Sequence, residues 1–282
     1  MDERLQLIEA VEIGIDRVNR HGRRHGRSLL LGRQSVASRR VPASTRAAAK
    51  STASRYKPVS KDDCFGARRT SRAVPELESS TVPSPADQII ELYEHHALDW
   101  DRGRGRGLLE AAWLDRFLAA LPATPAAILD IGCGAAEPMA RYCIEKGHRV
   151  TGIDASPSLI EMCRNRFPDH DWLTSDMRAM ALGRRFHGLL AWDSFFHLAY
   201  DDQRRMFPVF RAHAAENAAL MFTSGPAHGE AIGSFQGKPL YHGSLDPSEY
   251  RQLLDDNGFD VVTHIAEDPT CGGHTIWLAR LR

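Results

Sequence analysis

A short apolar run followed at once by paired glycines is the first feature that could carry chemistry. It lies in the segment ILDIGCGAAEPMARY at residues 128–142. Gly132 and Gly134 allow the backbone to turn tightly and to lie close against a ligand, because neither residue has a Cβ. Asp154 stands further along, at the end of the next apolar run, where its carboxylate can accept hydrogen bonds from both hydroxyls of a ribose. The pattern predicts a nucleoside-containing ligand at a strand-to-helix turn.

The residue that follows the turn separates two classes of cofactor. A dinucleotide-binding fold carries Gly-x-Gly-x-x-Gly, and the N-terminus of its helix holds a pyrophosphate. Here the third glycine position is Glu137, and we expect its carboxylate to point at the place of the pyrophosphate and to repel it. The sequence therefore disfavours a dinucleotide. The structural alternative for Glu137 is a charge that interacts with the N-terminus of the following helix.

Four motifs, in this order, resemble those of the class I S-adenosylmethionine-dependent methyltransferases. They are DIGCG at residues 130–134, GIDAS at 152–156, SDM at 175–177 and AWDSFFHL at 191–198. The resemblance extends from near Ser84 to the C-terminus. It implies a methyltransferase whose cofactor is S-adenosyl-L-methionine and whose sheet is Rossmann-like.

The resemblance also implies roles for individual residues. Asp154 would hold the ribose, and Asp176 would accept a hydrogen bond from the adenine amino group. The loop under the methionine part of the cofactor would consist of Asp130, Gly132, Cys133 and Gly134. The neighbours of the adenine would be Ala155, Ser156 and Met177. The residues facing the methionine end and the methyl group would be Trp192 and Asp193, and the lid over the cofactor would include Tyr93 and Trp100.

Several of these residues also have a purely structural interpretation. Trp192 could belong to the core, Cys133 could simply fill a tight turn, and Tyr93 and Trp100 could pack on the sheet. Asp154 has no comparable alternative, because a carboxylate that ends an apolar strand has little structural reason to be there.

The sequence departs from the family pattern at two places. Ala136 stands where a third glycine is often found, and an alanine is tolerated there if its backbone angle is ordinary. The segment 192–195 reads Trp-Asp-Ser-Phe, where amino-group methyltransferases of nucleic-acid bases carry Asn/Asp-Pro-Pro-aromatic. That difference argues against base methylation by enzymes of that kind.

Methyl transfer needs a general base only where the acceptor carries a proton. The candidates are His197, after the fourth strand, and His228, Glu230 and His242 in the predicted loop at residues 224–245. A surface or hydrogen-bonded histidine is the structural alternative for each of the three. No metal site is predicted.

The positions of these motifs follow from an alternation of strands and helices. Strands are predicted at residues 127–131, 149–154, 172–174, 186–192 and 218–223, with a final hairpin within 259–281. Helices are predicted at residues 84–100, 108–121, 136–146, 157–167, 201–215 and 247–257. This order predicts a doubly wound, Rossmann-like α/β fold with a seven-stranded, mostly parallel sheet and a C-terminal antiparallel hairpin.

The formal net charge of zero conceals a segregation along the chain. Residues 17–72 contain sixteen Lys and Arg against two acids, and residues 20–83 are poor in large apolar side chains. We expect residues 1–83 to be a largely disordered basic N-terminal arm, with a short helix at residues 5–19, and residues 84–282 to be the methyltransferase domain. The arm could bind nucleic acid, or it could be a solvated tail or sequence translated upstream of the true start.

Five widely spaced cysteines without a Cys-x-x-Cys pair argue against a disulfide framework or a cysteine-rich zinc site. No apolar run is long enough to span a bilayer, and the acidic N-terminus is unlike a secretory signal. These features predict a cytoplasmic protein, monomeric or homodimeric, that methylates a small molecule. The alternatives are a nucleic-acid or protein methyltransferase recruited through the basic arm, and a cofactor-binding regulator without catalytic activity.

Overall fold

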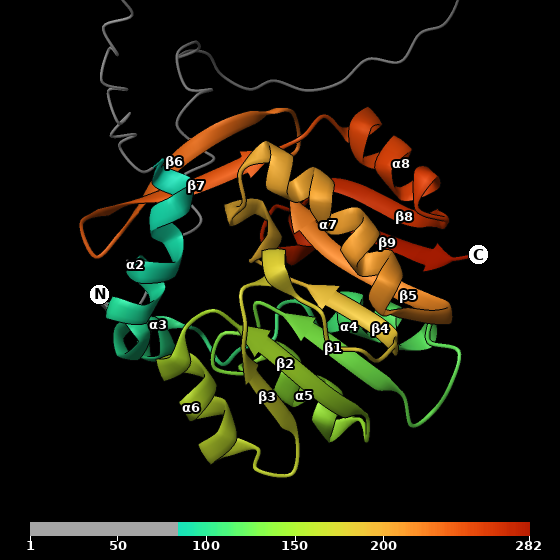
Figure 1. Ribbon diagram of the computed structural model, residues 1–282, viewed down its shortest axis with the longest axis horizontal. Coiled ribbons are helices and arrows are strands. Elements are labelled where there is room, and N and C mark those ends of the chain that lie inside the picture. The colour runs from blue at the N-terminus through green and yellow to red at the C-terminus, as the bar shows by residue number, and fades with distance from the viewer. Residues whose placement is uncertain (1–83) are drawn as a thin grey trace, which may run out of the picture. The chain divides into compact units, whose positions relative to one another are not determined.

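The computed structural model describes residues 84–282, which contain a seven-stranded sheet and a separate two-stranded sheet (Figure 1). The predicted arm at residues 1–83 and its short helix lie outside the described residues. The strands are β1 (Ala127–Ile131), β2 (Arg149–Asp154), β3 (Asp171–Thr174), β4 (Phe186–Ala191), β5 (Ala214–Ser224), β6 (Gly229–Phe235), β7 (Lys238–Ser244), β8 (Phe259–Asp268) and β9 (His274–Leu281). The large sheet has the order β3-β2-β1-β4-β5-β9-β8.

The pairs from β3 to β5 are parallel, whereas β9 runs antiparallel to both β5 and β8. The predicted fold class, with its mostly parallel sheet and C-terminal antiparallel hairpin, is therefore confirmed. The helices are α2 (Ile89–His95), α3 (Ala97–Gly103), α4 (Ala111–Ala119), α5 (Met139–Glu145), α6 (Pro157–Arg166), α7 (Tyr200–His213) and α8 (Pro247–Asp256). Within residues 84–282, no helix combines the length and the apolar character needed to cross a bilayer.

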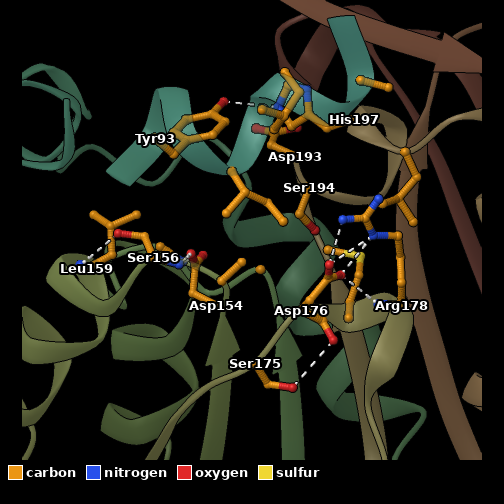
Figure 2. Close-up of a pocket in the computed structure, with 18 of the residues that line it drawn as sticks. Tyr93, Asp154, Ser156, Leu159, Ser175, Asp176, Arg178, Asp193, Ser194 and His197 are labelled. Carbon is orange, nitrogen blue, oxygen red and sulfur yellow. Dashed lines mark hydrogen bonds and ion pairs between the residues drawn. The ribbon is translucent and has the colours of Figure 1, made fainter. Parts of the chain in front are cut away.

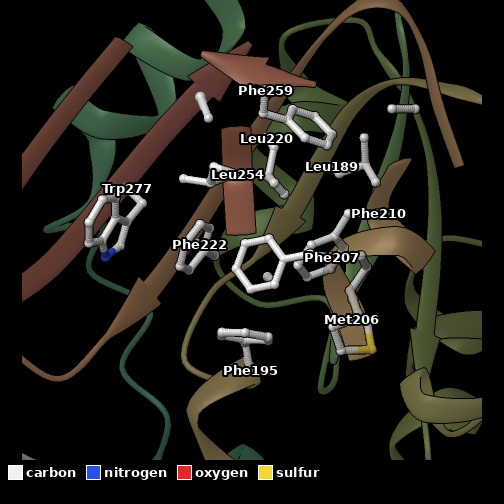
Figure 3. Packing of buried hydrophobic residues seen from close by; sticks show 14 of the residues in the cluster. Leu189, Phe195, Met206, Phe207, Phe210, Leu220, Phe222, Leu254, Phe259 and Trp277 are labelled. Atoms are coloured by element: carbon white, nitrogen blue, oxygen red, sulfur yellow. The ribbon is translucent and has the colours of Figure 1, made fainter. Parts of the chain in front are cut away.

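Helices cover both faces of the sheet because the strands bury apolar side chains on both sides. One core cluster joins α7 and α8 to the sheet through aromatic residues that include Phe207, Phe222 and Trp277 (Figure 3). The other cluster joins α4, α5 and α6 to the opposite face and includes Trp113 and Trp172. On each face, a layer of helices buries the apolar surface of the sheet, as expected for a doubly wound fold.

The prediction of a loop at residues 224–245 is wrong, because most of this segment forms the antiparallel hairpin of β6 and β7. Gln236 and Gly237 connect the two strands with φ angles of 51° and 73°. Two consecutive residues with positive φ are typical of the tight turn that matches the twist of a hairpin. The glycines and the proline of this segment suggested a loop, but Pro239 lies in a two-stranded sheet where both strands are edges.

Two helix predictions also differ from the structure. The helix expected at residues 84–100 begins as a short 3₁₀ turn, η1 (Pro85–Gln88), and then divides at His96 into α2 and α3. The helix expected from Ala136 begins only at Met139. Ala136 has a φ of 65°, so the condition that its backbone angle be ordinary is not met. Its left-handed conformation ends the glycine turn and delays the helix.

Candidate functional site

A cavity lies at the carboxyl ends of the parallel strands, where a doubly wound sheet binds its ligands (Figure 2). It measures about 820 Å³ with its open mouth included. Its lining contains the predicted site residues Tyr93, Trp100, Gly132, Gly134, Asp154, Ala155, Ser156, Asp176, Met177, Asp193 and His197. Residues far apart in the sequence thus meet around one space.

The glycine turn after β1 forms the floor of this cavity. The backbone N–H groups of Gly132 and Cys133 both donate to the carbonyl oxygen of Ile153, at 2.8 and 2.9 Å. Gly132 has a φ of 73°, and a Cβ there would lie 2.4 Å from the Cβ of Ser194. A side chain at this position would therefore be strained and would collide with the segment after β4. The close approach of the two loops explains the glycine.

Asp154, at the end of β2, holds the glycine turn in place. Its Oδ2 accepts from the backbone N–H of Gly134 at 2.9 Å, and its Oδ1 accepts from that of Ser156 at 2.9 Å. Burial raises the pKa of Asp154, although these backbone hydrogen bonds oppose the rise. Each oxygen has a second lone pair, so the carboxylate can still accept from a ligand that lies in the cavity.

Asp176 already has a charged partner in the described structure. Arg178 donates to both of its carboxylate oxygens, with Nε at 3.1 and 2.9 Å, and also lies 3.6 Å from Asp202. Burial alone would raise the pKa of Asp176, but the hydrogen bonds and the charge of Arg178 lower it. Arg178 lines the cavity too, and no sequence motif pointed to it.

Tyr93 on α2 and His197 form a hydrogen-bonded pair at the wall of the cavity (Figure 2). His197 Nδ1 lies 2.6 Å from the carbonyl oxygen of Tyr241, which can only accept, so Nδ1 carries the proton. Nε2 therefore accepts from the hydroxyl of Tyr93, 2.9 Å away. Burial lowers the pKa of His197 to about 3. This histidine is neutral near pH 7 and is a weak base.

Asp193 follows β4 and lies between cavity and core. Its Oδ1 is 3.1 Å from Nε2 of His274, and its Oδ2 is 3.9 Å from Nη2 of Arg104. Burial alone would raise the pKa of Asp193, but the charges of His274 and Arg104 lower it. Neither His274 nor Arg104 belongs to a predicted motif, because their contacts bring together segments distant in sequence.

The lid of the cavity is the pair of helices α2 and α3, held from two sides. The hairpin places Phe235 against Tyr93 and Trp100, with ring centroids 5.9 and 5.8 Å apart. On the other side, Glu94 accepts from the hydroxyl and the backbone N–H of Ser158 at 2.7 and 3.1 Å. Figure 1 shows the hairpin beside α2. The sequence did not reveal either anchor.

Several predicted residues do not line the cavity. His228 is exposed and packs on Tyr200, and Glu230 accepts from the Tyr241 hydroxyl at 2.9 Å. His242 lies behind His197, with ring centroids 4.9 Å apart. Cys133 and Trp192 are buried in the core, as their structural interpretations had it. Asp130 is also buried and lies outside the lining of the cavity.

Glu137 does not point at the glycine turn either. It pairs with Arg141 one turn along α5, with Nε at 2.9 and 2.7 Å from its two oxygens. The carboxylate expected to repel a pyrophosphate is therefore engaged in an ion pair with Arg141, and Glu137 does not line the cavity.

Three buried polar atoms near the cavity have no hydrogen-bond partner in the described structure. They are Oδ2 of Asp130, Oε2 of Glu110 and Nε1 of Trp192. The register places Asp130 opposite Leu190, and Trp192 follows on the same face of β4. Buried polar groups normally have partners, and the unpaired carboxylate oxygens of Asp130 and Glu110 would suit the ammonium group of a ligand such as S-adenosylmethionine.

Residues 128–217 match the profile of a family described as a methyltransferase domain. No curated protein sequence matches the chain. Among solved structures, the fold is similar to that of CalS10, an amino pentose methyltransferase of Micromonospora echinaspora with S-adenosylmethionine bound. The TM-score is 0.52 and the sequence identity is 18%, over an alignment that spans 67% of this chain and 96% of CalS10.

Two further structures have the same fold. The 1,6-didemethyltoxoflavin-N1-methyltransferase of Burkholderia thailandensis has a TM-score of 0.54 and 18% identity, covering 72% of this chain and 92% of its own. Magnesium protoporphyrin IX methyltransferase of Synechocystis PCC 6803 has a TM-score of 0.56 and 15% identity, covering 72% of this chain and 100% of its own. These similarities show the fold, and the profile match indicates that residues 128–217 belong to a methyltransferase domain.

Proposed function

Because the described part of the chain is a class I S-adenosylmethionine-dependent methyltransferase domain, we propose that it transfers a methyl group from that cofactor to a small-molecule acceptor. The class and the cofactor implied by the four sequence motifs are confirmed. The acceptor class is our inference from the cavity. The lid helices border a space of about 820 Å³, its open mouth included, which suits a nucleoside cofactor and a compact acceptor.

The cofactor would be held by residues of the strand ends. Asp154 would accept from the ribose hydroxyls, Ser156 and Met177 would border the adenine, and Asp130 would face the ammonium group. Burial and the charge of Asp154 raise the pKa of Asp130 to about 7, so a positive partner would stabilise its ionised form. The cofactor supplies an activated methyl group when bound.

The protein's contribution to such a reaction is mainly alignment and exclusion of water. Holding acceptor and methyl in line can supply about 7–11 kcal/mol of the barrier. Tyr93 donates its proton to His197, so its oxygen offers lone pairs toward the cavity and can accept from an N–H or O–H of the acceptor. His197 thus orients Tyr93, and its weak basicity suits acceptors with a free lone pair.

The direct test of this proposal is turnover with a panel of acceptors. The full chain is incubated with S-adenosylmethionine and, separately, small amines, phenols, thiols, duplex DNA, RNA and unstructured peptides, and formation of S-adenosylhomocysteine is followed. We expect turnover with a small molecule. Turnover only with nucleic acid or peptide would favour the alternative acceptors, and tight binding without turnover would favour a regulator.

We expect the rate of methyl transfer to be independent of His197 ionisation between about pH 5 and pH 8. With its pKa near 3, His197 stays neutral through this range. The measurement is the pH dependence of turnover in the wild type and in His197→Asn. A rate that falls as the pH drops through about 6.5, and that loses this dependence in His197→Asn, would contradict the assignment.

Replacing Phe235 by alanine should loosen the lid more than the fold. Phe235 is buried in a small cluster of its own, outside the two main cores, so its loss removes the contact with Tyr93 and Trp100. We expect S-adenosylhomocysteine to dissociate about tenfold faster, which corresponds to a loss of roughly 1.4 kcal/mol of packing free energy at the lid. This loss is smaller than the free energy that full burial of a phenylalanine side chain can contribute. Stopped-flow dissociation measures this rate. Ile232→Ala, exposed on the same hairpin, is the control and should leave it unchanged.

A further inference from the structure

Asp193 lines the cavity and has an unusual backbone conformation. Its φ is 48°, a left-handed conformation that is uncommon outside glycine. The hydroxyl of Thr223, on β5, accepts from its backbone N–H at 2.9 Å and so fixes this conformation. The side chain is 22% exposed and reaches the cavity from the end of β4 (Figure 2). Strained residues that persist in a cavity wall are often functional.

His274 holds the far side of this carboxylate. Its Nδ1 lies 2.6 Å from the carbonyl oxygen of Cys271, and its Nε2 lies 3.1 and 3.3 Å from the two oxygens of Asp193. The carbonyl oxygen can only accept, and Asp193, whose pKa is lowered by the neighbouring charges, is ionised and can only accept too, so both ring nitrogens carry protons. His274 is therefore an imidazolium in this arrangement.

The charges around Asp193 and His274 also favour the protonated form of His274. Burial alone would lower the pKa of His274, but the charge of Asp193 and the hydrogen bonds to Asp193 and Cys271 raise it to about 11. Arg104 adds a second positive charge next to Asp193, and is itself 3.4 Å from Glu110. The groups facing Asp193 from the lid, from η3 (Phe195–His197) and from β7 are Tyr93, His197 and His242.

Asp193 shares the cavity with the predicted ribose and methionine contacts, Asp154 and Gly132. The methyl-bearing sulfur of S-adenosylmethionine is positive, whereas the sulfur of S-adenosylhomocysteine is neutral. A carboxylate that stays ionised in this part of the cavity would favour the positive ligand.

We propose that His274 is a positioning residue that holds Asp193, as a carboxylate, toward the positive sulfur of the bound cofactor, so that the site distinguishes the methyl donor from the spent product. This inference rests on the proposed function, because it assumes that the cavity binds the cofactor. It adds two residues from outside the sequence motifs to the site, Arg104 and His274, and gives Asp193 a specific role. The preference would help S-adenosylhomocysteine to leave after each turnover.

The test compares the affinities of the full-length protein for S-adenosylmethionine and S-adenosylhomocysteine by calorimetry, from about pH 5.5 to about pH 8. Asp193→Asn keeps the shape of the side chain and removes its charge, and should reduce the preference for the donor about tenfold. His274→Gln should retain the preference at the upper pH and lose it as the pH falls, because Asp193 then protonates more readily. His274→Lys, which restores a positive charge, should recover part of the loss.

The exposed Asp169 provides the matched control, and Asp169→Asn should leave both affinities unchanged. A merely structural role for His274 would lower both affinities in proportion at every pH, and that result would overturn the proposal. An unchanged preference in Asp193→Asn would overturn it as well. A wild-type protein that binds neither ligand would instead contradict the proposed function itself, so the two failures are distinguishable.

Discussion

Replacing Asp154 by alanine is expected to weaken S-adenosylhomocysteine binding by about 10²–10⁴-fold. Each hydrogen bond from a ribose hydroxyl to a charged group contributes roughly 1.5–3 kcal/mol, and Asp154 would accept two of them. The same carboxylate holds the backbone N–H groups of Gly134 and Ser156, so its loss also frees the glycine turn. Calorimetric titration of S-adenosylhomocysteine into the wild type and the variant measures the effect.

Two further variants separate the loss of the ribose contact from a general loss of structure. Asp154→Asn preserves the size of the side chain and one acceptor oxygen, so we expect a folded protein whose binding is still clearly weakened. Asp169→Ala removes an exposed carboxylate far from the turn in sequence and should bind like the wild type. Wild-type affinity in both Asp154 variants would exclude Asp154 as the ribose contact.

Gly132→Ala is expected to abolish cofactor binding and to destabilise the domain. The new methyl group would lie 2.4 Å from the Cβ of Ser194 and 2.9 Å from its Oγ, far inside contact distance. The backbone there has a φ of 73°, which costs an alanine about 1 kcal/mol before any collision. To relieve the clash, the turn after β1 and the segment after β4 must move apart, and both line the cavity.

Gly147→Ala is the matched control for this variant. Gly147 also has a positive φ, 86°, but a Cβ there would meet no atom within 4 Å. We therefore expect Gly147→Ala to lower the free energy of unfolding by about 1 kcal/mol and to keep full affinity for S-adenosylhomocysteine. Chemical denaturation and calorimetry on both variants make the comparison. Equal losses of affinity in the two variants would show that strain alone, and not contact with Ser194, explains the effect.

The sequence predicted those parts of the site that depend on local patterns. The glycine turn, Asp154 and the alternation of strands and helices lie within short segments, and each has a strong physical reason for its residue types. Seven of the predicted strands, counting the final hairpin as two, appear in the large sheet. The parallel order then brings the ends of β1, β2 and β4 together without further information.

The rest depends on contacts between segments that are distant in sequence. His274 is one of thirteen histidines, and only the pairing of β9 with β5 places it beside Asp193. The sequence left the direction of Trp192 open between the cavity and the core, because a residue just past a strand end can turn either way, and the structure places it in the core. The hairpin was missed because its turn, Gln236-Gly237, lacks the usual asparagine or aspartate before the glycine.

The functional assignment rests on the location of the cofactor in the cavity beneath α2. The measurement that tests it most directly is a crystal structure of the full chain with S-adenosylhomocysteine. We predict that the ribose hydroxyls will lie within hydrogen-bond distance of Asp154 and that the adenine will lie beside Ser156 and Met177. Density for the ligand at any other place, with this cavity filled only by water, would contradict the account.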